Sequence, residues 1–344
     1  MMSRISPLLL TLAVGLFGLL APTLSNAQVK MWTLEELKNS PATPNIEYGL
    51  KHPNRVVKLD LTAKKLKELP EGVSQFTNLQ YLSLYLNDFE TIPAAVFELE
   101  NLQVLHVGRN KLTSVPAEIS KLKNLKVLGL NDNQISVVPE GIQQLGKLEK
   151  LDISKNPLLA LPDWMPKMKS LTSLDLSDCK QLNTTEYLSL FASIKTLRTL
   201  VLRNTGMTDL PASIGTLKEL EHLDLSLNPN IRPRKTLARL ARLSKLKTLV
   251  LDSLGLTELP IEFRQLNQLE ILSVANNKLD RVPNVVPELH SLKQLNIRTN
   301  PLVNYPSDIG KLTQLQNLNI KGHSLPYLKR IALNKLLPHV AIQG

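Results

Sequence analysis

The stretch "LQVLHVGRNKLTSVPAEISKLKN" at residues 102–124 decides the fold, because the chain repeats it. The next segment, "LKVLGLNDNQISVVPEGIQQLGK" at 125–147, and a distant one, "LEILSVANNKLDRVPNVVPELHS" at 269–291, share the pattern L-x-x-L-x-L/V-x-x-N-x-L/I-x-x-x-P. A fixed period of this length is the signature of a repeat architecture, in which each unit buries its apolar side chains against its neighbours.

The prolines give the period of the repeat. A step of 23 residues separates Pro70, Pro93, Pro116, Pro139 and Pro162, and the same step separates Pro260, Pro283 and Pro306. The intervals from Pro162 to Pro211 and from Pro211 to Pro260 are each 49 residues, which is 23 plus 26. Twelve units therefore run from residue 56 to about 323, and two of them, 171–196 and 220–245, have 26 residues and lack the proline at the repeat position.

The spacing within each unit predicts its local structure. The L-x-L stretch alternates, so it predicts a short strand whose leucines point inward. The asparagine then turns the chain, and the proline segment returns along the other side in extended or 3₁₀ form, because proline has no amide donor. Stacked units give an α/β solenoid, a curved horseshoe with a parallel β-sheet on its concave side and a mostly 3₁₀ or extended convex side.

The two units that lack the repeat proline are expected to carry true α-helices on the convex side. In "TTEYLSLFASIKT", Thr184 or Thr185 is the expected cap, and apolar residues recur at Leu188, Phe191 and Ile194. "RKTLARLARLSK" repeats this spacing with Leu237, Leu240 and Leu243. Both patterns are typical of a helix with one buried face.

These motifs resemble the leucine-rich repeat family, and the L-P-x-x-I/V variant is similar to the subfamily found in bacterial surface proteins and Ras-associated scaffold proteins. The resemblance implies a binding function for the concave face. It also implies that the ninth residue of each unit bonds backbone groups of neighbouring turns, forming a ladder of Asn87, Asn110, Asn133, Asn156, Cys179, Asn228, Asn277 and Asn300. Cysteine is a familiar substitute there, so Cys179 is expected to be structural rather than a nucleophile or metal ligand. Leu254 occupies the same position and cannot hydrogen-bond through its side chain.

The two ends of the chain depart from the repeat. Residues 1–27 combine Arg4, an apolar run and the small residues before Gln28, which predicts a signal peptide and an exported, periplasmic or extracellular protein. No later segment is apolar enough to predict a transmembrane helix in the mature chain. Residues 28–55 are the expected N-terminal cap, with Thr33 and Glu36 in a capping box and a second helix start at Thr43-Pro44. The repeats fill 56–323.

Residues 324–344 are the expected C-terminal cap. A helix there is predicted to pack against the last repeat through one apolar face, and "HVAIQ" is expected to form a final edge strand. The apolar positions of that helix face are Leu328, Ile331, Ala332 and Leu336.

The concave positions near the N-terminus carry apolar and aromatic side chains that the leucine core does not account for. Exposed apolar clusters often mark interaction sites, and tyrosine is enriched in binding hot spots. We therefore expect a protein partner to bind there, with Arg109 as a charged rim; the predicted contacts are Tyr81, Tyr85, Leu86, Val104, His106, Arg109 and Val127.

A second, polar patch follows along the same wall and consists of Asp132, Asp152, Asp175, Asp178, Arg203 and Asp224. Asp152 and Asp175 occupy the same column in adjacent units. Such a pair is suited to acid–base work or to cation binding, but an open strand wall also accommodates solvated carboxylates or contacts to a basic ligand. The sequence has no phosphate loop, serine elbow or zinc motif, so it predicts no enzyme, cofactor, metal site or small-molecule substrate.

The charge of the chain leaves one alternative open. Lys and Arg outnumber Asp and Glu by 41 to 30, for a formal net charge of +11, and a basic run of Arg232, Arg234, Lys235, Arg239 and Arg242 is expected on the convex side. A protein of this charge can bind an anionic polymer or a carbohydrate of the cell envelope. The aromatic content of 4% is too low for the stacking surfaces of single-strand nucleic-acid binders.

Overall fold

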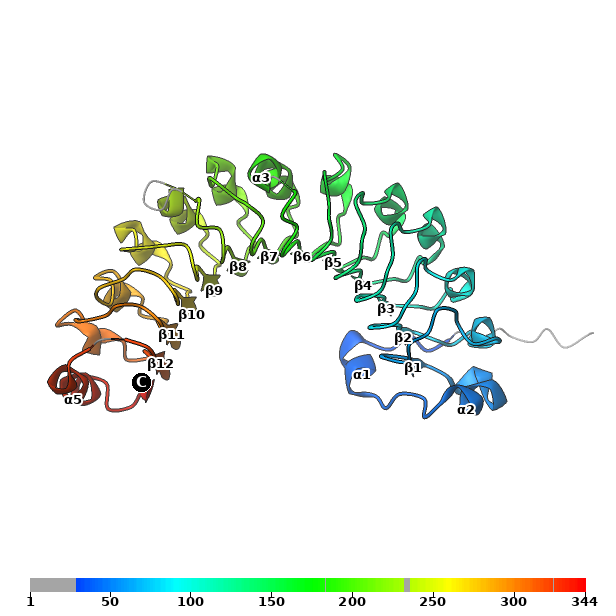
Figure 1. The fold of residues 1–344 in the computed structure, drawn as a ribbon, viewed down its shortest axis with the longest axis horizontal. Helices are drawn as coiled ribbons and strands as arrows, with labels where there is room; N and C mark the ends of the chain where they lie inside the picture. Colours follow the sequence, from blue (N-terminus) through cyan, green and yellow to red (C-terminus); the bar gives the residue numbers. More distant parts are fainter. Residues whose placement is uncertain (1–28, 183, 232–235, 324) are drawn as a thin grey trace, which may run out of the picture. The chain divides into compact units, whose positions relative to one another are not determined.

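The computed structural model describes residues 29–182, 184–231, 236–323 and 325–344. The expected signal peptide, 1–27, lies outside these residues. Residues 31–344 form one compact unit, and its described strands make a 13-stranded sheet in which each strand lies beside the next one along the chain. Figure 1 shows these strands on the inner side of an arc, with most helical turns on its outer side. The predicted leucine-rich solenoid with a parallel concave sheet is confirmed.

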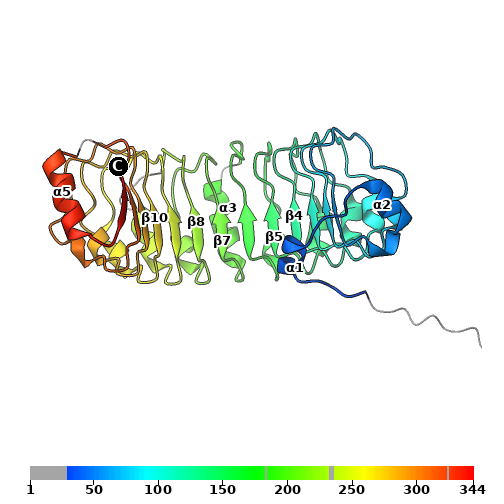
Figure 2. The same ribbon diagram turned by 90° about the horizontal axis from the view of Figure 1, so that it is seen from below.

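In each repeat the strand consists of the first leucine of the L-x-L motif and the residue on either side of it, and the strands pair in parallel, as the side-on view in Figure 2 illustrates. The register places Leu59, Leu82 and Leu105 opposite one another, all almost fully buried. The strands are β1 (Lys58–Asp60), β2 (Tyr81–Ser83), β3 (Val104–His106), β4 (Val127–Gly129), β5 (Lys150–Asp152), β6 (Ser173–Asp175), β7 (Thr199–Val201), β8 (His222–Asp224), β9 (Thr248–Val250), β10 (Ile271–Ser273), β11 (Gln294–Asn296), β12 (Asn317–Asn319) and β13 (Ala341–Gln343).

The convex side consists mostly of single 3₁₀ turns. In several units the repeat proline is the residue before the turn and has an extended ψ, as at Pro93, Pro116 and Pro260, so proline sets the point where the turn begins. The 3₁₀ helices are η1 (Pro53–Arg55), η2 (Val73–Gln75), η3 (Ala94–Glu98), η4 (Ala117–Lys121), η5 (Glu140–Gln144), η6 (Met165–Lys167), η7 (Ala212–Thr216), η8 (Ala238–Arg242), η9 (Ile261–Gln265), η10 (Val286–Glu288) and η11 (Ile309–Lys311).

The two long units differ from each other. The first contains the expected α-helix, α3 (Thr184–Ser193), which buries Leu188 and Phe191. In the second, residues 232–235 lie outside the described residues; Thr236 and Leu237, which follow them, are α-helical, and the helical segment then continues as the 3₁₀ helix η8. Part of the extra length is in the turn before it, where buried Ile231 donates its N–H to the carbonyl of Asn228. The expected apolar positions Leu237, Leu240 and Leu243 are nevertheless fully buried.

The N-terminal cap consists of two short helices, α1 (Leu34–Asn39) and α2 (Ile46–Lys51). The capping box of Thr33 and Glu36 is present. The second helix starts later than predicted, because Asn45 rather than Thr43 accepts from the backbone of Tyr48. Thr43 instead donates its N–H to the carbonyl of Lys58 in β1.

The C-terminal cap contains the predicted helix, α5 (Tyr327–Leu336), and the predicted edge strand, β13, but the helix presents a different face to the repeats. Leu333 and Leu337 are buried, whereas Leu328, Ile331, Ala332 and Leu336 are exposed. Two bonds hold this rotation: Tyr305 donates its hydroxyl proton to the carbonyl of Lys329, and the Lys329 ammonium donates to the carbonyl of Val303. No helix in the described residues is both long and apolar enough to cross a membrane.

In most units the ninth residue joins consecutive turns by side-chain hydrogen bonds. Asn110 is typical: its Nδ2 donates to the carbonyls of Leu84, one unit earlier, and of Val107, while its Oδ1 accepts from the N–H of Phe89. The same Nδ2 donation to a carbonyl 26 residues earlier is made by Asn87, Asn110, Asn133, Asn156, Asn228, Asn277 and Asn300. These bonds satisfy turn groups that the solenoid buries away from water.

A second set of side chains, not anticipated from the sequence, joins the units at their other edge. In five units the residue before the repeat leucine donates to a carbonyl 24 residues earlier: Asn78 bonds Asn54, Asn101 bonds Thr77, and Asn124 bonds Glu100. Ser170 and Ser291 make the same bond with a hydroxyl. In these units a second side chain therefore bonds the neighbouring unit, on the other side of the strand from the ladder.

Asn277→Ala is expected to lower the free energy of unfolding by about 3 kcal/mol or more, because it leaves two buried donors unpaired. The Oδ1 of Asn277 accepts from the N–H groups of Leu254 and Leu256, both at 3.0 Å. Denaturant unfolding measures the change. Asn317→Ala is the control: Asn317 is exposed on β12, and its replacement is expected to change stability by less than about 0.5 kcal/mol. Equal losses in the two variants would contradict the role of the ladder.

Candidate functional site

The predicted aromatic contacts form a packed group on β2 and β3. The Tyr81 ring lies between Lys58, whose Nζ is 4.9 Å from the ring centroid, and the ring of His106, whose centroid is 5.6 Å away. Lys58 is itself fixed, because its ammonium donates to three carbonyls at the end of α1, those of Leu37, Lys38 and Ser40. We call Tyr81, Tyr85, Leu86 and His106 the tyrosine patch.

The other predicted contacts divide into buried and exposed residues. Val104 is only 5% exposed, so the prediction that its side chain is available to a partner is wrong; it packs beneath its neighbours on the inner wall. Val127 is half-buried. Arg109 is exposed, and its Nε lies 3.2 Å from Oδ2 of Asp132, so the expected cationic rim is paired with a carboxylate of the second patch.

Two glycines let the polar side chains of the wall lie close to the backbone. A Cβ at Gly129 would lie 2.8 Å from Nδ1 of His106, and a Cβ at Gly108 would overlap the side chain of Asn131. His106 therefore lies partly over the neighbouring unit. Burial lowers the pKa of His106 and so favours the neutral imidazole. The charges of Asp152 and Asp60 oppose this shift, with a smaller effect.

The residue that follows each strand and precedes the ladder position has a left-handed backbone. Leu86 has φ 57° and Leu227 has φ 57°, a conformation that costs a non-glycine residue energy because its Cβ crowds the following carbonyl. Leu86 is also 42% exposed, so its side chain projects from the turn beside Tyr85. The same backbone recurs at Arg109, Asp132, Lys155, Asp178, Asn204, Ser253, Asn276 and Thr299.

The carboxylates of the second patch are held by their own turns. In the repeated Asp-x-Ser sequences, Asp152, Asp175 and Asp224 each accept from the N–H and the hydroxyl of the serine two residues later, with hydroxyl–Oδ1 distances of 2.6, 2.5 and 2.5 Å. Asp178 accepts from Asn204 at 2.5 Å. Arg203 makes a long bond of 3.4 Å to Ser226. One oxygen of each clamped carboxylate thus stabilises the wall.

The environment of Asp175 raises the pKa of its carboxyl group. Burial raises its pKa, the bonds from Ser177 oppose the rise, and the nearby charges of Asp152 and Asp224 add to it. Asp252, which accepts from Ser273 and Ala275 of the next unit, has its pKa raised by burial in the same way. Among the described residues, no group of three or more His, Cys, Asp or Glu side chains is placed to hold a metal ion.

Cys179 occupies its ladder position with the side chain fully buried. Its Sγ lies 3.5 Å from the carbonyl of Ile153, the acceptor that an asparagine at this position would use. Burial raises the pKa of the thiol to about 11, so the reactive thiolate is scarce at neutral pH. The other two unusual residues of the ladder position are also buried: Thr205 donates to the carbonyl of Leu202, and Leu254 packs in the core.

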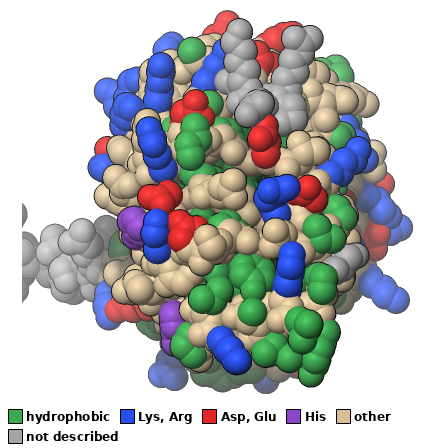
Figure 3. All heavy atoms as spheres, turned by 90° about the vertical axis from the view of Figure 1, so that its left-hand side faces the viewer, with side chains coloured by type: hydrophobic (Ala, Val, Ile, Leu, Met, Phe, Trp, Pro, Cys, Tyr) green, Lys and Arg blue, Asp and Glu red, His purple; other side chains and the backbone are tan. Residues whose placement is uncertain are grey.

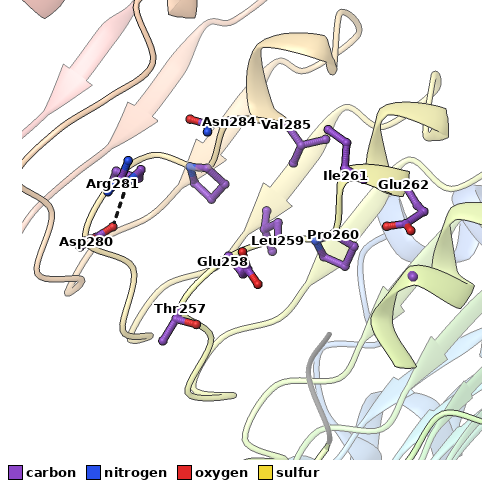
Figure 4. Close-up of a pocket in the computed structure, with 12 residues that line it drawn as sticks. Thr257, Glu258, Leu259, Pro260, Ile261, Glu262, Asp280, Arg281, Asn284 and Val285 are labelled. Carbon is purple, nitrogen blue, oxygen red and sulfur yellow. Dashed lines mark hydrogen bonds and ion pairs between the residues drawn. The ribbon is translucent and has the colours of Figure 1, made fainter. Parts of the chain in front are cut away.

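A cavity of about 870 Å³ lies on the flank of the solenoid, away from the strands. It is formed by the segments that follow the ladder residues in two successive units, 257–262 and 280–285 (Figure 4). Asp280 and Arg281, which line it, form an ion pair with each other. The tyrosine patch and the clamped carboxylates do not line this cavity.

The basic run on the convex side is only partly described. Arg232, Arg234 and Lys235 lie outside the described residues. Arg239 donates to the carbonyl of Leu210 and pairs with Asp209 at 3.7 Å, so its charge is engaged within the solenoid. Arg242 lies at the end of η8.

Comparison with known families agrees with this geometry. The leucine rich repeat family matches residues 100–158 and 123–181, and the leucine-rich repeat region family matches residues 230–333. Together these matches cover more than half of the chain.

The chain is a leucine-rich-repeat protein.

Solved structures with the same fold include an internalin (inlF) from Listeria monocytogenes, 20% identical, with a TM-score of 0.63, covering 86% of this chain and 88% of the internalin. The functional domain of InlJ from the same organism, which includes a cysteine ladder, is 19% identical, with a TM-score of 0.54 and coverages of 81% and 66%. At these identities the likeness concerns the fold.

A plant peptide hormone receptor, RGFR1 in complex with RGF2, is 22% identical, with a TM-score of 0.54. The match covers 84% of this leucine-rich-repeat chain but only 47% of the receptor chain. A search of the curated proteins found no match.

Asp175→Asn is expected to keep the solenoid as stable at pH 7 as the wild type, or to stabilise it. Because burial raises the folded-state pKa of Asp175, stability from this group is lost as pH rises above its ordinary value of 3.8, and asparagine removes that loss while keeping an acceptor for Ser177. Melting temperatures at pH 7 and pH 3 measure the effect, which should vanish at pH 3. Asp88→Asn should act in the opposite direction at pH 7, since Lys111 lowers the pKa of Asp88. A loss of stability on Asp175→Asn at pH 7 would contradict this assignment.

The thiol of Cys179 is expected to resist alkylation by iodoacetamide in the native protein at pH 8 and to react once the chain is unfolded in urea. Mass spectrometry measures both rates. Cys179→Ser should preserve the fold, because a hydroxyl can donate to the carbonyl of Ile153 in place of the thiol. Native labelling at the rate of a free cysteine would show that the residue is accessible and not a structural member of the ladder.

Proposed function

We propose that this protein is an exported, non-enzymatic binding module that recognises a protein partner through its concave face, with the tyrosine patch as the main contact. Export is inferred from the signal-like composition of residues 1–27. The partner is a protein rather than a small molecule, because the wall offers a long row of side chains on a stiff parallel sheet instead of an enclosed pocket.

The observation that carries this proposal is the position of Leu86. Leu86 is unfavourable for the isolated monomer in two ways. Its left-handed backbone costs energy in a residue with a Cβ, and its side chain, which is 42% exposed, gains little from burial. It adjoins Tyr85, and the neighbouring Tyr81 ring is held in one orientation by Lys58 and His106. Pre-ordered aromatic side chains beside an exposed apolar one are what a binding hot spot requires, because little side-chain entropy remains to be lost.

The same wall gives little support to catalysis. Asp152 and Asp175, the residues best placed for it, each commit one carboxylate oxygen to a serine of their own turn. The thiol of Cys179 is buried and has a raised pKa. A binding role accounts for these carboxylates, because basic side chains of the same partner can contact the acidic wall beyond the tyrosine patch.

Leu86→Asn is the sharpest test, because it separates binding from stability. Asparagine tolerates the left-handed turn better than leucine, so the melting temperature should stay the same or rise, while affinity for the partner should fall by about 2 kcal/mol, or roughly 30-fold, if Leu86 is a hot-spot contact. The partner is first captured on the immobilised wild-type protein from envelope and culture fractions, and its affinity for each variant is then measured by calorimetry.

Leu227→Asn is the matched control, since Leu227 has the same residue type and the same φ of 57° on a distant unit. It should give a similar change in melting temperature and leave affinity unaltered. Tyr85→Ala should weaken binding as Leu86→Asn does. If Leu86→Asn and Tyr85→Ala both retain full affinity, the tyrosine patch is not the contact.

A further inference from the structure

The C-terminal end of the solenoid presents an apolar helix face to solvent. Tyr327 and Leu328 are 74% and 77% exposed, and Ile331 and Leu336 are 37% and 41% exposed. Figure 3, which looks onto this end of the molecule, shows hydrophobic side chains gathered in its lower part with Lys and Arg side chains among them. We call Tyr327, Leu328, Ile331 and Leu336 the α5 face.

The α5 face is not simply a poorly packed core. The opposite side of the helix is already buried through Leu333, and Leu337 is buried immediately after the helix. The bonds of Lys329 to the Val303 carbonyl and of Tyr305 to the Lys329 carbonyl fix the rotation of the helix. The sequence therefore places large apolar side chains on both sides of α5, and only one side is used by the solenoid.

The C-terminal segment that carries the α5 face is basic. Residues 309–344 contain no Asp or Glu, and their charged side chains are Lys311, Lys321, Lys329, Arg330 and Lys335. Within the described part of this segment, only Lys311 is ion-paired, with Asp308 and Glu288 just upstream. Lys335 is exposed and lies one turn after Ile331, on the same side of the helix as the apolar residues.

We propose that α5 docks the protein onto an anionic phospholipid bilayer, with the α5 face in the headgroup–acyl boundary and the surrounding lysines and Arg330 against the headgroups. An exposed amphipathic helix with basic and no acidic residues has the chemistry that such a surface attracts. A bilayer conforms to the projecting side chains of Tyr327 and Leu328, and it lets the ammonium of Lys335 extend to the headgroups while its methylene chain remains in the apolar layer.

A second copy of the chain fits this end less well. Two-fold pairing of α5 with itself would bring together two ends that each carry Lys321, Arg330 and Lys335 without a carboxylate between residues 309 and 344. An anionic surface instead neutralises these charges. The tyrosine patch lies on β2 and β3, near the opposite end of the sheet, so bilayer docking and binding of a partner are separable.

Flotation of residues 28–344, the chain without its expected signal peptide, with phosphatidylcholine vesicles, with and without about 30% phosphatidylglycerol, tests the proposal. The wild type should bind the anionic vesicles, more weakly at high salt, and should not bind pure phosphatidylcholine. Leu328→Ser combined with Ile331→Ser should reduce binding at least about tenfold, because the apolar contribution is lost. Lys335→Glu should also reduce it.

Two controls match these variants elsewhere on the solenoid. Val137→Ser with Leu159→Ser removes apolar side chains that are 65% and 63% exposed, and Lys169→Glu reverses an exposed charge; both should bind as the wild type does. Circular dichroism checks that each variant is folded.

Three results would overturn the proposal: no binding of the wild type to anionic vesicles, equal losses in the control variants, or a dimer in light scattering that Leu328→Ser with Ile331→Ser dissociates. The last result would make the α5 face an interface between two copies. None of these results would alter the expected loss of partner affinity in Leu86→Asn.

Discussion

The structure depends on how each unit satisfies the backbone of its buried turn. A strand of three residues contributes few ladder bonds of its own, and the turn after it leaves N–H and C=O groups facing the core. One asparagine side chain per unit reaches both the preceding unit and its own turn, as Asn110 does with Leu84, Phe89 and Val107. The period of the chain follows from this bond, because the next asparagine must arrive where the previous turn needs it. The concave wall, its left-handed turns and the side chains they project are consequences of that spacing.

The repeated features could be predicted from the sequence, because the residues that specify each feature recur at the same positions in successive units. The strand, the inward leucines and the proline before the 3₁₀ turn all have this property. Features that occur once were harder to predict. The prediction of which face of α5 is buried was wrong, because apolar residues lie on two sides of that helix and only the contacts of Tyr305 and Lys329 select between them. In the unit 220–245, the described part of the expected helix is α-helical only at Thr236 and Leu237 and then narrows to a 3₁₀ helix, because the three extra residues do not specify where the additional length is used.

Alternation along a strand also says which side a residue faces but not how deeply its neighbours cover it. Val104 faces the concave side as predicted by its position, yet it is buried between Tyr81 and Val127, the residues opposite it on the adjacent strands. Tyr81 is partly covered by Lys58 and His106 for the same reason. The left-handed conformation of Leu86 had no signal in the sequence, since leucine is not a residue that such turns favour. That mismatch is what makes Leu86 informative about function.

The two edges of the sheet differ in how they are finished. At β1 the carbonyl of Lys58 is already bonded by the N–H of Thr43 from the N-terminal cap, whereas β13 is the outermost strand at the other end of the described sheet. An open edge is a template on which further strands can add, and end-to-end polymerisation into a filament needs such a template at both ends. With its first edge bonded, this solenoid can extend by strand addition in one direction only. Head-to-tail stacking of copies, which would join β13 of one copy to β1 of the next, is therefore opposed by the cap that occupies β1.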